Sequence, residues 1–320
     1  MRIKSGILFI LIILLYACEI NTDKDLSSRS YNNYIKIPSS SSGIDFINKI
    51  EHDLASKSNL FDYDYFYNGS GVGVADFNND GLKDVFLCAN QAQNRIYLNK
   101  GGLSFEDITE KANINTNNKG WSSGVTFADI NQDGWIDIYI SQGGPYNKDK
   151  RRNLLLINQG DLTFIEKAEE YGLDDPGIST QSAFFDYDKD GDLDCIVMNE
   201  NDYYGLDPIS FYKLFEDKEL LRNNSSHLYE QKDGKFIDIT EKAGLLNPSF
   251  GLGLCISDLN NDSWLDIYIA NDYYVPDGMY INNGNGTFTD QIKNSTKQIS
   301  FYGMGVDIAD INNDNLKDIY

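Results

Sequence analysis

The chain has 320 residues, with 49 acidic against 27 basic side chains and a formal net charge of −22 at pH 7. This balance argues against nucleic-acid binding, which depends on Lys and Arg contacts to phosphate, and against a basic membrane-surface protein. Hydrophobic residues make up 41% of the chain, enough for a core, and the many Gly, Tyr and Phe residues favour short strands and turns. The two histidines leave little room for His-based catalysis or a zinc site.

The first segment predicts an export signal. Arg2 and Lys4 precede an apolar run of ten residues at 7–16, about half of what a membrane-spanning helix needs. The run ends in Leu15-Tyr16-Ala17-Cys18, which resembles the bacterial lipoprotein box and implies that residues 1–17 are removed and Cys18 is lipidated. The alternative is an ordinary secretory signal that carries a Cys. The polar, Ser-rich segment 18–43 then predicts a flexible tether to a lipid anchor in the outer membrane, at the cell surface.

Residues 44–69 lead into the repeats, and the stretch Ser42–Ile50 predicts a strand outside them. Cys88, Cys195 and Cys255 each lie in an apolar run without close spacing, which predicts buried thiols and not a disulfide framework. Neither of the two histidines, His52 and His227, is given a role by its sequence context.

One acidic pattern recurs five times in residues 70–320, and we number these loops one to five. Each has Asp at positions 1, 5 and 9 and Asp or Asn at position 3. The residues are Asp76, Asn78, Asp80 and Asp84; Asp129, Asn131, Asp133 and Asp137; Asp186, Asp188, Asp190 and Asp194; Asp258, Asn260, Asp262 and Asp266; and Asp310, Asn312, Asp314 and Asp318. The first Asp recurs at intervals of 53, 57, 72 and 52 residues.

The flanks of the loops repeat as well. Small and apolar residues precede each loop, with Gly five residues before the first Asp in every copy but the third, which has Gln181. An apolar run, a Gly-rich turn and a Phe-containing run follow in the first four units, so each unit predicts four short strands with the acidic loop between the first two. One such sheet cannot bury both faces, whereas radial stacking can, which predicts an all-β β-propeller. A β-solenoid is the alternative, although its repeats are usually shorter than about 53 residues.

Several stretches resemble known proteins, among them GIDFINKI, YFYNGSGVGVADFNNDGLKD and FYGMGVDIADINND. The units are similar to FG-GAP/VCBS repeats, the blades of integrin α-subunit heads and of many bacterial surface proteins. From about Gly43 to Tyr320 the chain resembles the UnbV/cartilage-acidic-protein (ASPIC) type. The resemblance implies a surface or secreted lipoprotein with no assigned reaction, further repeats and a separate C-terminal domain.

The acidic loops predict calcium sites. Positions 1, 3, 5 and 9 supply only oxygen ligands, which suit Ca²⁺ and not zinc or copper. An EF-hand would need Glu at position 12 and flanking helices, but loop one has Leu87 there. Position 6 is Gly in three loops; Ser263 makes loop four the weakest, and the four carboxylates of loop three predict the tightest binding. The metal's role would be structural, and the alternative is a solvated Asx-turn that only caps a hairpin.

A candidate ligand face lies opposite the acidic loops, where the connections between strands two and three gather. Exposed aromatics beside Asp and Asn suit stacking on a sugar or contact with a protein, although they can also pack loop against loop. The tyrosines are Tyr146, Tyr203, Tyr204, Tyr273 and Tyr274. The third unit carries an insertion from Tyr203 to about Ser226, whose stretch 211–223 predicts a short helix.

The sequence ends at Asp318-Ile319-Tyr320, where earlier copies continue through a strand, so we expect a longer protein whose last blade pairs with the strand at 42–50. No pair of carboxylates marks a catalytic centre. The sequence therefore predicts a lipid-anchored, calcium-stabilised propeller on the bacterial surface that recognises a glycan or a protein. The alternatives are a polysaccharide-acting enzyme and a structural scaffold of an envelope complex.

Overall fold

The computed structural model describes residues 34–56, 58–114, 120–201 and 213–320. The chain divides into two units, 1–38 and 39–320, and all the repeats lie in the second. The predicted signal peptide, Cys18 and most of the tether lie outside the described residues, and residues 34–38 are exposed without helix or strand. None of the helices in the described ranges is both long and apolar enough to cross a membrane.

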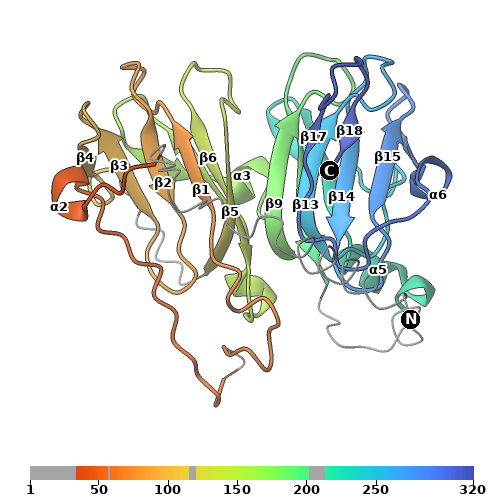
Figure 1. Ribbon diagram of the computed structural model, residues 1–320, viewed down its shortest axis with the longest axis horizontal. Helices are drawn as coiled ribbons and strands as arrows, with labels where there is room; N and C mark the ends of the chain where they lie inside the picture. The colour runs from red at the N-terminus through yellow and green to blue at the C-terminus, as the bar shows by residue number, and fades with distance from the viewer. Residues whose placement is uncertain (1–33, 57, 115–119, 202–212) are drawn as a thin grey trace, which may run out of the picture. The chain divides into compact units, whose positions relative to one another are not determined.

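The described part of the second unit contains four antiparallel four-stranded sheets, here called blades one to four, and a final two-stranded ladder (Figure 1). The strands are β1 (Val72–Ala75), β2 (Asp84–Leu87), β3 (Arg95–Asn99) and β4 (Phe105–Asp107); β5 (Trp121–Ala128), β6 (Asp137–Gly143), β7 (Leu154–Asn158) and β8 (Phe164–Glu166); β9 (Ile178–Phe185), β10 (Asp194–Glu200), β11 (His227–Lys232) and β12 (Lys235–Asp238); β13 (Gly251–Ser257), β14 (Asp266–Asn271), β15 (Gly278–Asn282) and β16 (Phe288–Asp290); and β17 (Ile308–Ala309) with β18 (Asp318–Ile319).

One short helix precedes the first strand and the others connect later strands. They are α2 (Ser39–Ser42), η2 (Lys148–Lys150), α3 (Ala168–Tyr171), η3 (Lys213–Glu216), α5 (Lys218–Asn223) and α6 (Ile292–Ser295). The helix predicted within the insertion of the third unit is present as α5, which begins where Asp217 accepts a hydrogen bond from the Leu220 N–H at 3.0 Å. Residues 202–212, which include the start of that insertion, lie outside the described residues.

Each sheet is a simple meander, in which every strand pairs with the next one in sequence. All five acidic loops connect the first two strands of their unit, and each position-9 Asp is the first residue of the second strand. The four-strand units and the placement of the acidic loops are therefore confirmed.

The blades pack face to face in sequence order. Ile138 and Ile140 of β6 lie in a core with Phe86 of blade one, whereas Tyr139 between them lies in a core with Cys195 of blade three. A third core joins blades three and four. Because both faces of such a strand are buried, it reads as a continuous apolar run. This packing confirms the all-β, propeller-type stacking of blades.

The first strands of neighbouring blades approach closely, which explains the repeated Gly. A Cβ on Gly71 of blade one would lie 2.9 Å from the backbone nitrogen of Val125 in blade two. A Cβ on Gly124 would lie 2.4 Å from the carbonyl oxygen of Thr180 in blade three. Neither distance is compatible with a side chain, so the Gly keeps adjacent blades in backbone contact.

No strand forms at Ser42–Ile50 among the described residues, whereas its expected pairing with a further blade stays a prediction. Residues 43–50 alternate between half-buried and exposed, but they join no β-ladder among the described residues. Side chains hold the segment instead: the Asn48 amide donates to the Asn90 side-chain oxygen at 2.7 Å, and the Tyr97 hydroxyl donates to Asp45 at 3.2 Å. The alternation therefore reflects an extended chain lying against blade one.

The cysteine prediction is only partly confirmed. All three described cysteines are free thiols, and Cys88 and Cys195 are buried in the cores between blades. Cys255 is half-buried, and its Sγ lies 3.3 Å from the carbonyl oxygen of Val306, in the segment leading to β17.

A buried ion pair closes the edge of blade three. His227 Nδ1 lies 2.5 Å from Asp175 Oδ2, and the same oxygen accepts a hydrogen bond from the Tyr229 hydroxyl at 2.8 Å. Burial disfavours both charges, but the attraction and hydrogen bond between the two groups favour them more. The pKa of His227 is therefore raised and that of Asp175 is lowered to about 2. The histidine without a sequence-assigned role is thus part of the packing of blade three.

Candidate metal centres

Loop two illustrates the geometry that the acidic loops share. Asp129 at position 1 accepts hydrogen bonds from the backbone N–H groups of Asp133 (3.0 Å) and Gly134 (2.8 Å). The turn requires positive φ at Gln132 (59°) and at Gly134 (88°). These bonds curl the backbone around the position-1 carboxylate.

Position 6 departs from Gly in loops four and five, yet the turn is kept. Ser263 has φ 71° and Asn315 has φ 67°. Their N–H groups still bond the position-1 carboxylates, Asp258 and Asp310, each at 2.8 Å. A left-handed conformation costs roughly 1–2 kcal/mol outside Gly, and Asn tolerates it better than Ser. Loop four therefore carries the strain that the sequence predicted.

In the four blades, the position-9 Asp is buried and hydrogen-bonds both its own loop and the third strand of the sheet. Asp137 accepts the N–H of Ile130, at position 2 of its own loop, at 3.0 Å, and the N–H of Asn158, at the end of β7, at 2.8 Å. Burial raises the pKa of Asp137 to about 6 and also raises those of Asp84 and Asp266. These carboxylates thus hold the loop to the sheet while remaining beside the other acidic groups.

Position 3 divides the loops into two kinds. In loop two, the Asn131 amide donates to Asp133 Oδ2 at 2.9 Å. Loops one, four and five have the equivalent bond, at 2.9, 2.8 and 3.1 Å. An amide N–H group thereby stabilises one carboxylate in each of these four loops without any ion.

Loop three has no such internal donor because position 3 is Asp188. One carboxylate oxygen from each of Asp186, Asp188 and Asp194 lies within 4.8 Å of the others. Asp186 Oδ1 is buried and has no hydrogen-bond partner among the described residues. Burial, and then the neighbouring Asp charges, raise the pKa of Asp194 to about 7 and also raise that of Asp188.

This geometry fits calcium. Ca²⁺ takes oxygen ligands at about 2.3–2.6 Å, so two ligands on opposite sides of one ion are roughly 5 Å apart. The separations within the cluster of Asp186, Asp188 and Asp194 fall within that limit. A buried carboxylate oxygen without a donor is also the kind of group that a bound cation would satisfy.

Sequence reasoning missed Asp192, at position 7 of loop three, where only a backbone carbonyl was expected. Its Oδ1 is also buried without a hydrogen-bond partner in the described chain. Burial and the adjacent Asp190 raise its pKa to about 6. The signal was available, because position 7 is Leu or Trp in every other loop.

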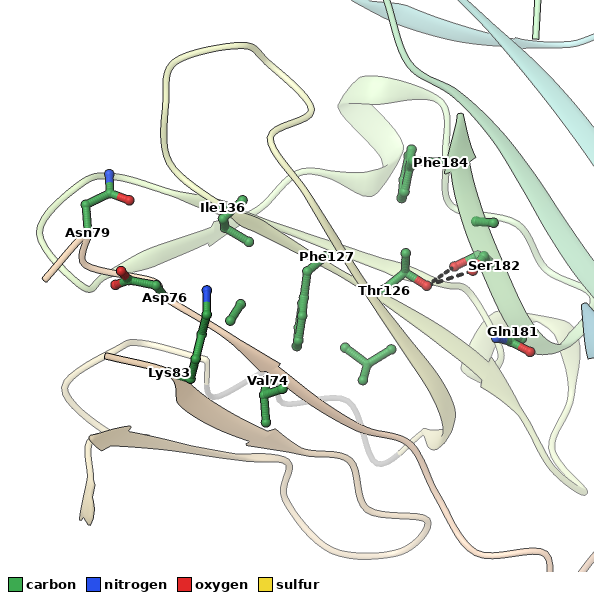
Figure 2. A pocket seen from close by; sticks show the side chains of 13 residues that line it. Val74, Asp76, Asn79, Lys83, Thr126, Phe127, Ile136, Gln181, Ser182 and Phe184 are labelled. Atoms are coloured by element: carbon green, nitrogen blue, oxygen red, sulfur yellow. Dashed lines mark hydrogen bonds between the residues drawn. The ribbon is translucent and has the colours of Figure 1, made fainter. Parts of the chain in front are cut away.

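The inner strands border a groove of about 730 Å³ beside loop one (Figure 2). Val74, Phe127 and Phe184 form apolar walls contributed by β1, β5 and β9. Asp76 of loop one and Lys83 line the groove together with these apolar side chains. The first acidic loop therefore borders this groove.

On the opposite face, the structure brings part of the predicted tyrosine group together. Tyr146 and Tyr273 are half-buried against the core of Tyr65 and Trp121, and Tyr274 is half-buried in an adjacent core around Phe250. Tyr203 and Tyr204 lie outside the described residues.

The lead-in segment, which the sequence reasoning did not place on this face, supplies much of that core. Tyr63 and Tyr65 are almost fully buried there, and the Tyr65 hydroxyl donates to Asp272 at 2.7 Å. A cavity of about 170 Å³ lies beside them and is also lined by Trp121 and by the buried carboxyl group of Glu200. The stretch YDYFY at 63–67, dense in aromatics, was the available signal.

The repeats of this chain resemble those of a known protein family. The family model described as FG-GAP-like repeat matches residues 63–140 and 258–320, which include acidic loops one, two, four and five. The chain therefore contains FG-GAP-like repeats at 63–140 and 258–320. The predicted family resemblance is confirmed at that level.

Individual relatives extend the FG-GAP match. The chain is 24% identical over 237 residues to cartilage acidic protein 1 of Homo sapiens, covering 74% of this chain and 32% of that protein. It is 30% identical over 154 residues to integrin alpha-8 of Mus musculus, covering 44% of this chain and 14% of that protein. The chain thus spans about a third of the length of the cartilage acidic protein it matches.

Among solved structures, an Agrocybe aegerita lectin that recognises non-reducing terminal N-acetylglucosamine aligns with a TM-score of 0.43 and 18% identity. The alignment covers 78% of this chain and 59% of the lectin.

Proposed function

We propose that this FG-GAP-repeat chain is a calcium-stabilised binding module. The observation that carries the proposal is loop three, where Asp186, Asp188 and Asp194 converge and Asp186 Oδ1 is buried without a hydrogen-bond partner among the described residues. Like charges held this closely repel, so a folded loop of this kind favours a bound cation.

The residues that would hold the metal are those at positions 1, 3, 5 and 9 of each loop, with Asp192 as an additional carboxylate in loop three. Bound Ca²⁺ would neutralise these carboxylates and fix the first two strands of each blade. The position-9 carboxylate would contribute while keeping its two backbone N–H bonds, since each oxygen has more than one lone pair.

We propose a glycan or a protein as the ligand of the face opposite the loops. The support is a group of half-buried tyrosines beside charged side chains: Tyr273 donates a hydrogen bond to Asp64, and the Lys150 amine lies 5.6 Å from the ring centre of Tyr146. Amphipathic aromatic rings with nearby polar groups are common in sugar and protein contact surfaces. We also propose that the module acts by binding and not by catalysis.

We propose that lipidated Cys18 anchors the module to the outer membrane of a bacterium, facing outward. The support is the basic, apolar and Cys-terminated leader in the sequence. Metabolic labelling with a fatty acid should mark the full chain, and Cys18→Ser should abolish the label. Labelled Cys18→Ser protein would refute the anchor.

The central experiment is thermal unfolding of the purified full chain in Ca²⁺, in Mg²⁺ and in EDTA. We expect a rise in Tm with Ca²⁺ that Mg²⁺ does not reproduce, because these loops offer many oxygen ligands in a flexible arrangement. Equal Tm values in Ca²⁺ and EDTA would refute the metal sites. Glycan-array and envelope-protein capture in Ca²⁺ then test the ligand, and turnover of a bound polysaccharide would favour the enzyme alternative.

A further inference from the structure

A buried asparagine connects loops one and two. Asn158, at the end of β7, is 1% exposed, and its amide donates to the carbonyl of Phe77 in loop one at 2.9 Å and to that of Ile136 in loop two at 3.1 Å. Its backbone N–H bonds Asp137 of loop two, and the Phe77 N–H bonds Asp84 of loop one at 3.0 Å. The position-9 carboxylates of both loops are therefore the two ends of one series of hydrogen bonds.

The same series of hydrogen bonds recurs between loops three and four. Asn282, at the end of β15, donates to the carbonyl of Tyr187 in loop three at 2.8 Å and to that of Leu265 in loop four at 3.2 Å. Its N–H bonds Asp266 at 2.8 Å, and the Tyr187 N–H bonds Asp194 at 3.1 Å.

Between loops two and three this series of hydrogen bonds is interrupted. The equivalent residue of blade three is Gln231, whose N–H still bonds Asp194 at 2.9 Å. Its longer side chain makes no hydrogen bond to loop two in the described structure, and its Oε1 is buried without a partner. The Ile130 carbonyl of loop two thus lacks the asparagine contact that Phe77 and Tyr187 receive.

A second set of contacts divides the loops in the same way. The position-4 side chain of loop one, Asn79, donates to the Gly134 carbonyl of loop two at 3.0 Å. The position-4 side chain of loop three, Lys189, lies 4.0 Å above the ring of Trp264 in loop four. No corresponding contact of Gln132 with loop three occurs among the described residues, although Gln132 has the same backbone conformation (φ 59°).

We infer that the metal sites work in pairs: occupation of loop one favours occupation of loop two, and loop three likewise favours loop four, whereas loops two and three are independent. The inference rests on the proposed calcium sites and adds that occupation of one site changes the affinity of its partner site. Binding at one loop fixes its position-2 peptide and thus the asparagine that bonds the next loop. The second loop then loses less conformational entropy when it binds its ion. This is positive coupling without a change of fold.

The test uses Tb³⁺, a luminescent substitute for Ca²⁺, because position 7 is Trp135 in loop two and Trp264 in loop four. Excitation of one Trp reports the ion bound in its own loop; because Lys189 of loop three lies on the ring of Trp264, an ion in loop three adds to the Trp264 signal until Asp190→Ala removes it. Trp264→Phe leaves loop two as the reported site, and Trp135→Phe leaves loop four. Each reporter is combined with Asp80→Ala, which disables loop one, or with Asp190→Ala, which disables loop three.

We expect Asp80→Ala to weaken Tb³⁺ binding at loop two by at least about fivefold, the lower end of ordinary coupling, and to leave loop four unchanged. Asp190→Ala should weaken loop four by a similar factor and leave loop two unchanged. The pairing is overturned if both variants weaken both sites equally or if neither has an effect. Absence of luminescence in both reporters would instead refute the metal sites themselves, and the pairing with them.

Two reciprocal variants test the connecting residue. Asn158→Gln copies the interruption and should abolish the effect of Asp80→Ala on loop two. Gln231→Asn should create the connection and make loop two respond to Asp190→Ala. If Asn158→Gln leaves the response of loop two to Asp80→Ala unchanged, the buried amide does not carry the coupling.

Discussion

Blades two and three have the same topology but stabilise their acidic loop and their edge with different side chains. Blade two uses neutral amides: Asn131 inside its acidic loop and Asn153 at its edge, where the Asn153 amide donates to the Tyr139 hydroxyl at 3.0 Å. Blade three has Asp188 in its loop and the His227–Asp175 pair at its edge. An amide supplies its own donor, whereas a buried carboxylate needs a counter-charge. Blade two thus supplies an internal hydrogen-bond donor to its acidic loop, whereas blade three depends on the protonation of His227 and, under the proposed calcium binding, more strongly on a metal ion.

The largest effect should come from breaking the ion pair. His227→Gln leaves Asp175 buried without its counter-charge, so the free energy of unfolding should fall by about 3–5 kcal/mol. His52→Gln, which changes the exposed histidine of the lead-in, is the matched control and should change stability little. Denaturant unfolding of both variants at pH 6 measures the difference, and equal stabilities would show that the pair is not needed.

The pair also predicts a pH dependence. His227 has a raised pKa, so its contribution is complete below the usual pKa of about 6.5 and is lost as the pH rises through the folded value. Asp175 has a pKa lowered to about 2, so its contribution is present above 3.8 and is lost as the pH falls toward 2. Wild type and His227→Gln should therefore differ most between about pH 4 and 6.5, and their stabilities should converge at both extremes.

Exchanging position 3 between the two loops sharpens the comparison. Asp188→Asn should stabilise the calcium-free protein and weaken calcium binding by about tenfold, or about 1.4 kcal/mol. Asn131→Asp should do the reverse in loop two. Calorimetric titration with Ca²⁺ and unfolding in EDTA measure both quantities. Changes of the same sign in the two variants would contradict the distinction between the loops.

Acid should substitute in part for calcium in blade three. Asp194 has a pKa of about 7 in the folded chain against 3.8 ordinarily, so the folded state binds the proton more tightly between these values. In EDTA, stability should rise as the pH falls from 7 to 4, by about 1–2 kcal/mol after allowance for solvent screening. Calcium affinity should fall over the same range because the proton competes for the carboxylate. A calcium affinity that is constant from pH 8 to 5 would exclude this competition.

The smallest expected change is a gain. Gln231→Asn removes a buried oxygen without a partner and places an amide where Asn158 and Asn282 make two bonds each, so stability in EDTA should rise by about 1 kcal/mol. Asn158→Gln is the reciprocal control and should lose a similar amount. Loss of stability in both variants would mean that Gln231 has packing of its own to preserve.

The blades and the positions of the acidic loops were predictable because they rest on local patterns that recur five times. Loop three's excess charge was equally visible as four carboxylates. The His227–Asp175 pair was not, because its two residues are 52 positions apart and meet only through the packing of blade three. The segment at 42–50 forms no strand among the described residues because alternation predicts an extended backbone but does not supply a partner strand.

The close approach of Gly71 to blade two, and of Gly124 to blade three, also limits how such an array can be altered. Any side chain there would force two blades apart at their inner edge and tilt everything beyond. A blade copied or transplanted from the first two units would therefore carry this spacing requirement with it. Engineering a longer or shorter array should tolerate changes at the rim but no side chain at Gly71 or Gly124, whereas blade three already has Gln181 at the equivalent position.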